Sequence, residues 1–346
     1  MRILYLGRQS GTCLDRADAL RRLGHELLHI DVRLLMPKTV WVDRVTWRLG
    51  GGWFSPWINN GLRTRIADQT FDLCYVDGGE WIPGSTIELL RKHAPLVVNY
   101  NIDDPFGPRD GARLIAYRRA AWLYDLCVVV RDENVLEARA HDVRNVLRVY
   151  RSADEVSHAP RTLSPQDREL WRADVLFLGT WFPERGPFLL ELVKRGVPLT
   201  IRGHKWQRAP EWEQLKPYWK GGSLFGDDYA RAIQCAKVNL GLLSKDNRDL
   251  HTTRSLEVPA LTGLLCAQRT SEHVAMYKEG EEALFWDDAD ECAQACRKVL
   301  ADEALRSRIA AAGHVRVRQN GHYNEHILRD ILEFATTLGV RGAEPA

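Results

Sequence analysis

The chain has 346 residues, which is longer than a chain that ordinarily folds around one hydrophobic core, and this length predicts two α/β domains of roughly 150 residues each. Lys and Arg number 48 against 46 Asp and Glu, and a net charge of +2 gives no bulk electrostatic argument for nucleic acid. No apolar run approaches the roughly 18–20 residues of a membrane-spanning helix, and the chain enters a strand pattern at once without a signal peptide. We therefore expect a cytoplasmic protein.

Strands and helices alternate along the first half. Apolar strands are predicted over residues 2–7, 26–31, 71–76, 96–101 and 126–130. A helix with apolar spacing is predicted to end at Leu23, with Gly24 as its C-cap. Short strands that alternate with helices favour βαβ units and a parallel sheet.

A polar segment around residues 150–172, with Pro160 and Pro165, indicates a linker. Beyond it a second series is predicted, with strands over 174–179, 199–203, 238–243 and 264–267 and helices over 188–195, from 290, and over 324–338. The end from residue 339 is expected to fray. The expected boundaries are an N-terminal domain 1–155, a linker 156–173, a C-terminal domain 174–322 and a final helix 323–340 that packs back on the N-terminal domain.

This organisation predicts an α/β fold with two Rossmann-like domains that face each other across a cleft. Ligands of open α/β sheets bind beyond the carboxyl ends of the strands, so the polar loops at those ends are where chemistry is expected. The seven cysteines show no metal-ligand spacing, and Cys292 and Cys296, four residues apart, are typical of helix packing.

One stretch, His251-Thr-Thr-Arg254-Ser-Leu-Glu257, combines several polar side chains just before Gly263 and an apolar strand. Arg254 and Glu257 are three residues apart, so on a helix they share a face. A carboxylate can grip a diol and a guanidinium can grip a phosphate. That pairing is what a nucleotide-sugar site needs.

Two further loops follow predicted strands of the second half. The loop 179–186 precedes a helix, and its N–H groups with Arg185 would suit a diphosphate; an ordinary turn with a solvated arginine fits the loop as well. The run Arg202-Gly203-His204-Lys205-Trp206 ends the next strand. Its glycine permits close backbone approach, while His204 and Lys205 could meet a phosphate or a sugar.

In order and spacing these motifs resemble the nucleotide-binding domain of GT-B glycosyltransferases, in particular the CgeB-like, spore-protein-type branch related to retaining family 4 enzymes. The resemblance covers about residues 174–335. The matching stretches are Phe177-Leu-Gly179-Thr180 with Arg185-Gly186, Ile201-Arg-Gly203-His-Lys-Trp206, and Thr253-Arg254-Ser-Leu-Glu257-Val-Pro-Ala-Leu-Thr-Gly263.

The resemblance implies that Glu257 holds the ribose hydroxyls of a UDP- or GDP-type sugar donor and that Arg185 binds its diphosphate. The implied donor site comprises Thr180, Arg185, Gly203, His204, Lys205, Leu224, Phe225, Asp249, His251, Thr252, Thr253, Arg254 and Glu257, with Leu224 and Phe225 in a loop over the nucleobase. Thr180 stands where many family 4 members have Arg, which leaves a phosphate to Lys205 or Arg254. Asp249 replaces the family's Glu eight residues before Glu257.

The first half resembles an acceptor domain only in outline. Asp103 and Asp104 follow a predicted strand, and adjacent carboxylates could raise one another's pKa and supply a general base; capping of the next turn is the alternative. Asp77 is a second candidate at the neighbouring strand end. The expected acceptor-side residues are Gly11, Thr12, Trp53 and Trp81. GT-B enzymes usually stabilise the leaving diphosphate with cations and helix dipoles, so no metal is expected.

Four tryptophans, Trp41, Trp47, Trp53 and Trp57, flank Gly50-Gly-Gly and fall in a segment expected to be flexible. Aromatic faces stack on sugar rings, so an acceptor platform or lid is one interpretation. Packing beneath a long loop is the other.

The leading interpretation is therefore a metal-independent glycosyltransferase that binds a nucleotide-sugar and an acceptor hydroxyl. The alternatives are a nucleotide-sugar epimerase or hydrolase of the same fold, and a non-catalytic surface-assembly protein. A nicotinamide oxidoreductase is disfavoured because Gly7-Arg-Gln-Ser-Gly11 lacks the G-x-G-x-x-G spacing. No cofactor beyond the donor, no nucleic acid and no transmembrane segment are expected, while a peripheral membrane contact, the acceptor and the oligomeric state stay open.

Overall fold

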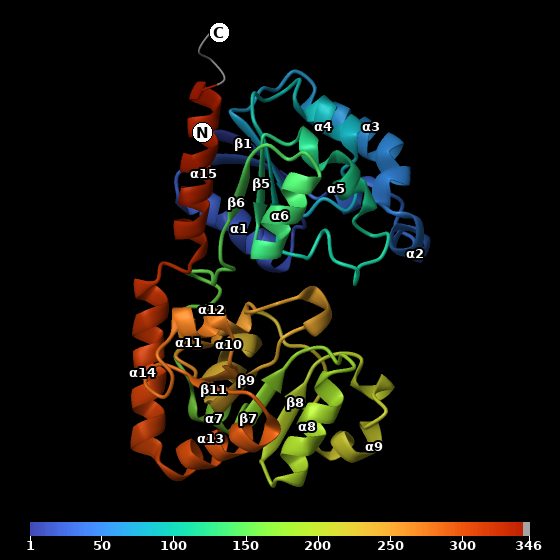
Figure 1. Cartoon of the computed structure of the whole chain (residues 1–346). Coiled ribbons are helices and arrows are strands. Elements are labelled where there is room, and N and C mark those ends of the chain that lie inside the picture. Colours follow the sequence, from blue (N-terminus) through green and yellow to red (C-terminus); the bar gives the residue numbers. More distant parts are fainter. Residues whose placement is uncertain (342–346) are drawn as a thin grey trace. The chain divides into compact units, whose positions relative to one another are not determined.

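The structure, a computed structural model, describes residues 1–341 and divides them into two compact units, each built on its own parallel sheet (Figure 1). The first unit comprises Met1–Arg151, a short excursion at Asp246–Arg248, and the chain from Asn324. The second unit comprises Ser152–Lys245 and Asp249–Tyr323. The two-sheet α/β fold predicted from the sequence is confirmed.

The first unit contains a six-stranded sheet in the order β2-β1-β3-β4-β5-β6. Its strands are β1 (Arg2–Leu6), β2 (Glu26–Ile30), β3 (Leu73–Asp77), β4 (Val97–Asn101), β5 (Leu126–Val129) and β6 (Val146–Arg148). Side chains alternate between its faces: Leu4 and Leu6 of β1 join one core cluster, and Ile3 and Tyr5 join the other. Both faces are thus covered, as a parallel sheet requires.

Helices lie on both faces of this sheet. They are α1 (Gly11–Arg22), α2 (Val40–Leu49), α3 (Ser55–Ile66), α4 (Gly84–Leu90), α5 (Ile115–Ala120), α6 (Asp132–Ala140) and α15 (Asn324–Arg341). The last of them packs beside α1, and its apolar stripe of Ile327, Leu328, Ile331 and Ala335 joins the core around Leu20 (Figure 1).

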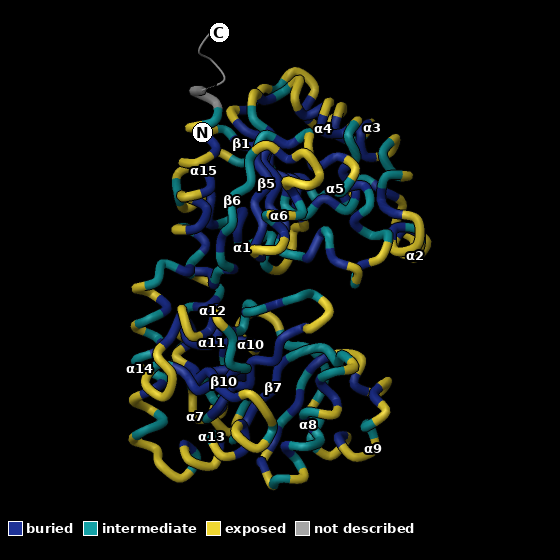
Figure 2. The backbone as a smooth tube through the Cα atoms, viewed as in Figure 1, coloured by how far each residue is buried: buried dark blue, intermediate teal, exposed yellow. Residues whose placement is uncertain are grey.

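The second unit contains a five-stranded sheet in the order β11-β10-β9-β7-β8. Its strands are β7 (Ala173–Leu178), β8 (Leu199–Arg202), β9 (Ala236–Gly241), β10 (Leu265–Gln268) and β11 (Leu284–Trp286), and its helices are α7 (Pro165–Leu170), α8 (Arg185–Lys194), α9 (Trp212–Leu215), α10 (Gly226–Cys235), α11 (Arg254–Ala260), α12 (Ser271–Met276), α13 (Ala289–Ala301) and α14 (Glu303–Gln319). Figure 2 shows most strands of both units buried, whereas the edge strands β2 and β6 are largely half-buried and exposed residues lie mainly on helices and loops.

Three sequence expectations need correction. Strands β6 and β11 have only three residues each, which is too short for a periodic signal, and they were not predicted. The segment around Gly50-Gly-Gly, expected to be flexible, is helical, because α2, a 3-10 turn at Gly51–Phe54 (η2) and α3 follow one another directly. The final helix continues past Leu338 to Arg341; the rest of the tail expected to fray lies outside the described residues.

None of the helices within residues 1–341 combines the length and the hydrophobicity that a bilayer span requires.

Candidate functional site

Glu257 is the buried centre of a polar cluster in the second unit. It lies on α11 and is 3% exposed. Its Oε2 accepts hydrogen bonds from the Tyr229 hydroxyl at 2.5 Å and from Arg254 Nη1 at 2.6 Å. Its Oε1 has a longer contact, 3.5 Å, with His158 Nε2. Because a carboxylate has about four lone-pair sites, Oε1 keeps the capacity to accept hydrogen bonds from a ligand.

The pKa of Glu257 lies below its ordinary value. Burial acts to raise this pKa, but the charges of Arg254 and His158 and the hydrogen bond from Tyr229 outweigh it. Glu257 is therefore ionised at neutral pH and acts as a pure acceptor. Such a group suits the two hydroxyls of a ribose, both of which can donate.

Arg254 and Glu257 share a helix face as predicted, but they pair with each other. The Arg254 side chain is 32% exposed and lies over the Tyr229 ring at 4.8 Å. The Thr253 hydroxyl accepts from Arg254 Nη1, whereas Thr252 Oγ1 is buried with no hydrogen-bond partner in the described chain. A buried hydroxyl without a protein partner is one that a polar ligand group could satisfy.

The loops after β7 and β8 lie side by side. Gly203 has φ +148°, and a Cβ there would come within 1.9 Å of the Gly179 carbonyl oxygen, so only glycine fits. Trp206 Nε1 donates to that carbonyl at 2.9 Å, and Trp181 N donates to the His204 carbonyl at 2.9 Å. His204 and Lys205 are exposed at this edge of the sheet, together with half-buried Thr180.

Arg185 begins α8 and is almost fully buried. Its guanidinium donates to the carbonyls of Thr180, Leu242 and Leu243 at 2.9–3.3 Å, so it ties the loop after β7 to the segment after β9. In this arrangement its visible role is structural. Binding of a diphosphate by Arg185 stays a prediction.

The remaining predicted donor residues lie at different depths. His251 is buried and pairs through Nδ1 with Glu272, and Asp249 is buried after η6 (Lys245–Asn247). Leu224 is half-buried and Phe225 is 75% exposed just before α10. Since α10 carries Tyr229, the loop at 222–225 leads directly to the Glu257 cluster.

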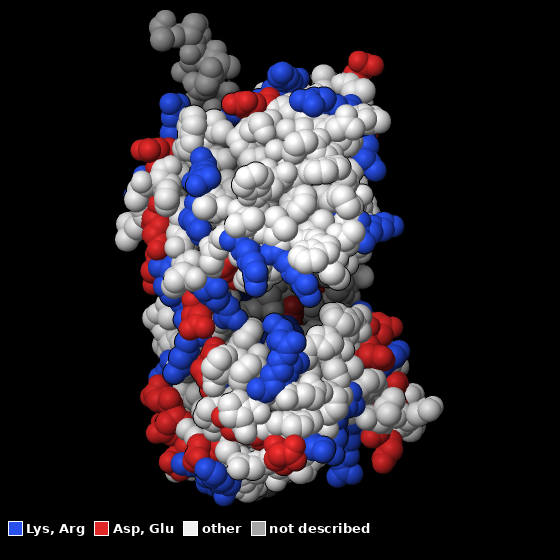
Figure 3. Space-filling view, turned by 90° about the vertical axis from the view of Figure 1, so that its right-hand side faces the viewer, with Lys and Arg blue, Asp and Glu red and all other residues white. Residues whose placement is uncertain are grey.

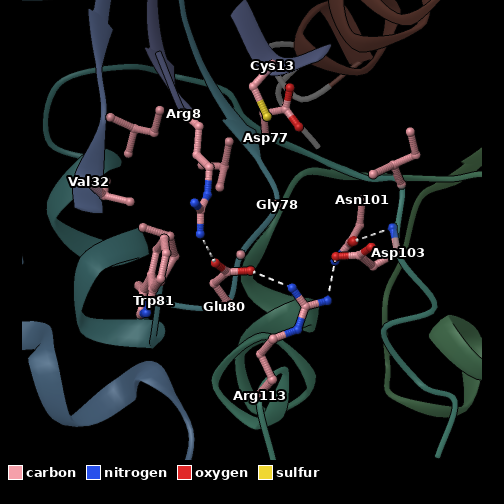
Figure 4. Close-up of a pocket in the computed structure, with 16 residues that line it drawn as sticks. Arg8, Cys13, Val32, Asp77, Gly78, Glu80, Trp81, Asn101, Asp103 and Arg113 are labelled. Carbon is pink, nitrogen blue, oxygen red and sulfur yellow. Dashed lines mark hydrogen bonds and ion pairs between the residues drawn. The ribbon is translucent and has the colours of Figure 1, made fainter. Parts of the chain in front are cut away.

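A second polar site lies in the first unit, at the carboxyl ends of β1, β3 and β4. It is a cavity of about 240 Å³ (Figure 4). Glu80 lies between Arg113, whose Nη1 donates to Oε2 at 3.0 Å, and Arg8, whose Nη2 donates to Oε1 at 3.4 Å. Asp103 accepts from Arg113 Nη2 at 2.5 Å and has a side chain 40% exposed.

Glu80 and Asn101, which both line this cavity, have polar atoms that a ligand could contact. Burial raises the pKa of Glu80 above its ordinary value, against the opposing charges of Arg113 and Arg8. Asn101 is 1% exposed, and its Nδ2 has no hydrogen-bond partner in the described chain. The cavity thus combines a donor, a carboxylate of raised pKa and a partly open carboxylate.

Asp77 has a different environment from the one expected of a general base. Arg16 Nε and Nη2 donate to its two oxygens at 2.7 and 2.9 Å, and the Tyr5 hydroxyl donates to Oδ2. Its side chain is 2% exposed and that of Arg16 is 4% exposed. The arrangement is a buried ion pair that joins β1, α1 and β3.

Asp104 is likewise held in place. Arg248 donates to it twice, Nε to Oδ2 at 2.7 Å and Nη2 to Oδ1 at 2.6 Å, and Asn134 Nδ2 donates to Oδ1 at 2.7 Å. Burial acts to raise the pKa of Asp104, but these hydrogen bonds outweigh it and leave the pKa below its ordinary value. The expectation that adjacent Asp103 and Asp104 raise each other's pKa is therefore wrong for Asp104, because Arg248 neutralises it.

The predicted acceptor-side residues lie in different environments in the structure. Trp81 is buried beside the cavity, donates to Thr46 Oγ1 at 3.0 Å and has Arg8 over its ring at 5.3 Å. Gly11 has φ +57° and begins α1 with Thr12 after the β1 loop. Trp53 is 68% exposed on η2.

Within the described residues, one group could offer metal ligands in a cluster: Cys266, Cys292 and Cys296, whose sulfur atoms lie within 4.8 Å of one another. All three are fully buried in the apolar core of the second unit, between β10 and α13. They lie with core side chains rather than in the polar sites described above.

Residues 185–333 match the glycosyl transferase-like family. The chain therefore contains a glycosyl transferase-like domain over these residues. Glu257, Arg254 and Tyr229 all lie within it. No curated protein matches the chain in sequence.

Solved structures resemble the whole chain at low sequence identity. Sucrose-phosphate synthase from Thermosynechococcus elongatus has a TM-score of 0.69 and 12% identity, covering 99% of this chain and 100% of its own. HepE of Anabaena in complex with UDP and glucose has a TM-score of 0.65 and 13% identity, and the match covers 97% of this chain and 100% of HepE. An alpha-glucosyltransferase in complex with UDP-glucose and DNA containing an abasic site has a TM-score of 0.67 and 13% identity, and the match covers 97% of this chain and 99% of that enzyme.

The two units of this chain together have the GT-B fold of these solved structures. The predicted fold and the predicted enzyme class, a glycosyltransferase, are confirmed together by the domain match and the fold. Neither the epimerase or hydrolase alternative nor the non-catalytic one gains support from them.

Several residues of the two sites were missed from the sequence. Tyr229 and His158 reach Glu257 from 28 and 99 positions earlier in the chain. Arg113 reaches Glu80 across 33 positions, and Arg248 reaches Asp104 across 144. Glu80 carried a signal, because it lies three residues after the end of a strand, where chemistry is expected.

Proposed function

We propose that the protein transfers a sugar from a UDP-sugar to the hydroxyl of an acceptor. The single observation that supports the donor half is the ionised, buried Glu257 within the glycosyltransferase domain, with Oε1 available to a diol. HepE and the alpha-glucosyltransferase were each solved with UDP or UDP-glucose, which favours uridine over the other bases.

The proposed donor site uses Glu257 for the ribose and Arg254 with Lys205 for the diphosphate. Arg254 is partly exposed beside Glu257, and Lys205 is exposed at the end of β8, whereas the donors of Arg185 go to backbone carbonyls. Cations at a departing diphosphate stabilise the charge that develops there. In this proposal they make a metal unnecessary, and an unchanged rate in the presence of a chelator is the expected result.

The finer placement in the CgeB-like branch, related to retaining family 4 enzymes, is also part of the proposal. It is supported by the stretch from Thr253 to Gly263, where a Cβ on Gly263 would come within 2.8 Å of Asn239 Nδ2. The stereochemistry of the glycosidic bond in the product, resolved by proton NMR, tests this placement: an inverted anomeric centre would contradict it.

A thermal-shift panel tests the donor. UDP and UDP-sugars at about a hundred times their Kd are expected to stabilise the protein by about 2.7 kcal/mol, a rise of several degrees in Tm. GDP-, CDP- and ADP-sugars at equal concentration are expected to shift Tm far less. A Tm that no nucleotide changes would contradict the proposal, and a GDP-sugar as the strongest ligand would overturn the uridine assignment.

For the acceptor half, we propose that the cavity of the first unit binds the acceptor, with Asp103 and Glu80 accepting from its hydroxyls. Both carboxylates line the cavity and are paired with Arg113, but the side chains of Asp103 and Glu80 keep 40% and 14% exposure. The ion-paired side chains of Asp77 and Asp104 are only 2% and 1% exposed. Asp103→Asn is expected to lower kcat on the order of a hundredfold, the lower end for loss of a general base, with UDP affinity unchanged. Asp68→Asn, an exposed aspartate of the same unit, is the control. A kcat that Asp103→Asn leaves intact would exclude Asp103 as the base.

A further inference from the structure

Six large apolar side chains of the first unit project into solvent from one short segment. They are Val40, Trp41, Trp47 and Leu49 on α2, Trp53 on η2 and Trp57 on α3, and we call them the tryptophan surface. The four indoles are 65%, 52%, 68% and 53% exposed in chain order. The alternative that these tryptophans pack beneath a loop is thus excluded. Trp41, Trp47 and Leu49 line one pocket, and a contiguous exposed apolar surface is typical of an interaction site.

The fold holds these side chains outward. Val42 and Thr46 face inward from α2, and the Trp81 indole donates to Thr46 Oγ1. A Cβ on Gly51 would come within 2.0 Å of the Glu80 carbonyl oxygen, so η2 is pressed against the loop after β3. Ile58 and Leu62 fix α3 in the core. The segment is therefore anchored from within, and its outer face is left for a partner.

The charges of the segment point to an anionic partner. Between residues 32 and 66 the chain has six cations and one acid, Asp43. Arg44 lies over the Trp41 ring at 5.3 Å, and Arg48 is exposed on the same helix. Figure 3 looks onto this side of the first unit, where uncharged side chains cover a wide area and the charges at its margin are mostly basic. A second copy would place these cations against one another, which disfavours a symmetric dimer.

Two anionic partners, single-stranded nucleic acid and a lipid surface, are distinguished by the aliphatic side chains of the tryptophan surface. Single-stranded nucleic acid would use aromatic rings for base stacking, but it has no use for exposed Val40 and Leu49. A lipid surface can contact the indoles, the aliphatic side chains and the arginines together. The indoles and aliphatic chains enter the boundary between headgroups and acyl chains, while the arginines bind the phosphates.

We propose that the tryptophan surface seats the protein on an anionic lipid bilayer. Resting on the proposed function, this names the acceptor as a membrane-borne molecule. Arg113 supports the link, because it lies over the Trp47 ring at 5.4 Å and also donates to Glu80 and Asp103 in the acceptor cavity. An acceptor anchored in the bilayer would present its hydroxyl beside that cavity.

Vesicle binding tests the proposal with the full chain and no donor. Co-sedimentation is expected with phosphatidylcholine vesicles that contain phosphatidylglycerol, with little binding to phosphatidylcholine alone and release by salt. The Trp41→Ser, Trp57→Ser double variant is expected to bind at least about tenfold more weakly. Trp122→Ser, at an indole 55% exposed elsewhere on the same unit, is the matched control and is expected to bind as the parent does.

A charge variant provides a second arm. Arg44→Glu with Arg48→Glu is expected to abolish binding to anionic vesicles, whereas Arg139→Glu, an exposed cation on α6, is expected to keep it. Absence of vesicle binding by the parent chain would overturn the proposal, as would tighter binding to a single-stranded oligonucleotide or a dimer that the double tryptophan variant disrupts. A UDP-sugar shift in Tm that persists without vesicle binding would leave the donor assignment standing, so the two failures are distinguishable.

Discussion

Replacing Glu257 by alanine is expected to weaken UDP binding about a hundredfold. Hydrogen bonds to a charged group contribute about 1.5–3 kcal/mol each, so losing a carboxylate that holds a diol costs about 3 kcal/mol. Since Glu257 carries a depressed pKa, its charge is present throughout the neutral range and the loss is expected at every pH from 6 to 8 or so. Isothermal titration calorimetry with UDP measures it directly.

The same substitution removes a partner from Tyr229 and Arg254, so a loss of folding must be separated from a loss of binding. Glu257→Gln keeps the shape and removes the charge; its Tm is expected to lie closer to that of the parent while UDP affinity still falls. Glu213→Ala, an exposed glutamate on α9 of the same unit, is the control and is expected to bind UDP normally. Parental affinity in a folded Glu257→Gln variant would remove Glu257 from the donor site.

Replacing Asp77 by alanine is expected to destabilise the first unit by about 3–5 kcal/mol. Breaking a buried ion pair leaves an uncompensated charge, here the guanidinium of Arg16, whose side chain is 4% exposed. The Tyr5 hydroxyl loses its acceptor as well. Urea denaturation followed by circular dichroism reports the change as a lower midpoint.

A double variant distinguishes this structural role from a catalytic one. Asp77→Leu with Arg16→Met replaces both charges by apolar groups and is expected to recover most of the stability, because the desolvation of both ions is avoided. If Asp77 is structural, the double variant is also expected to keep most of the transferase rate. A stable double variant without activity would instead return Asp77 to the catalytic candidates.

Local sequence patterns were enough for most elements of both sheets. Strand β5 and the part of β7 from Val175 are continuous apolar runs, because both faces of a parallel sheet are covered, and such runs can be recognised from the sequence alone. The strands β6 and β11 were missed, since three residues pair only because a longer neighbour is already in place. The glycine-rich segment was misjudged, because Gly50 ends α2 with φ +86° and so serves as a helix terminus, not a flexible link.

The candidate site divides in the same way. The shared helix face of Arg254 and Glu257 was accessible, because residues three apart on a helix are neighbours, whereas their ion pair with each other was seen only in the structure. The partners of the aspartates were not, since Arg16 meets Asp77 across 61 positions and Arg248 meets Asp104 across 144. Nothing in the neighbourhood of an aspartate in sequence indicates which distant arginine will neutralise it.

The sequence by itself thus determined the two parallel sheets, the polar loops at their carboxyl ends and the shared helix face of Arg254 and Glu257, because each depends on residues within a few positions of one another. Only the tertiary structure decided which arginine pairs with each carboxylate, how far each carboxylate is buried, and that the tryptophans of α2, η2 and α3 face solvent. Burial and ion pairing are set by groups far apart in the chain, and folding alone brings those groups together.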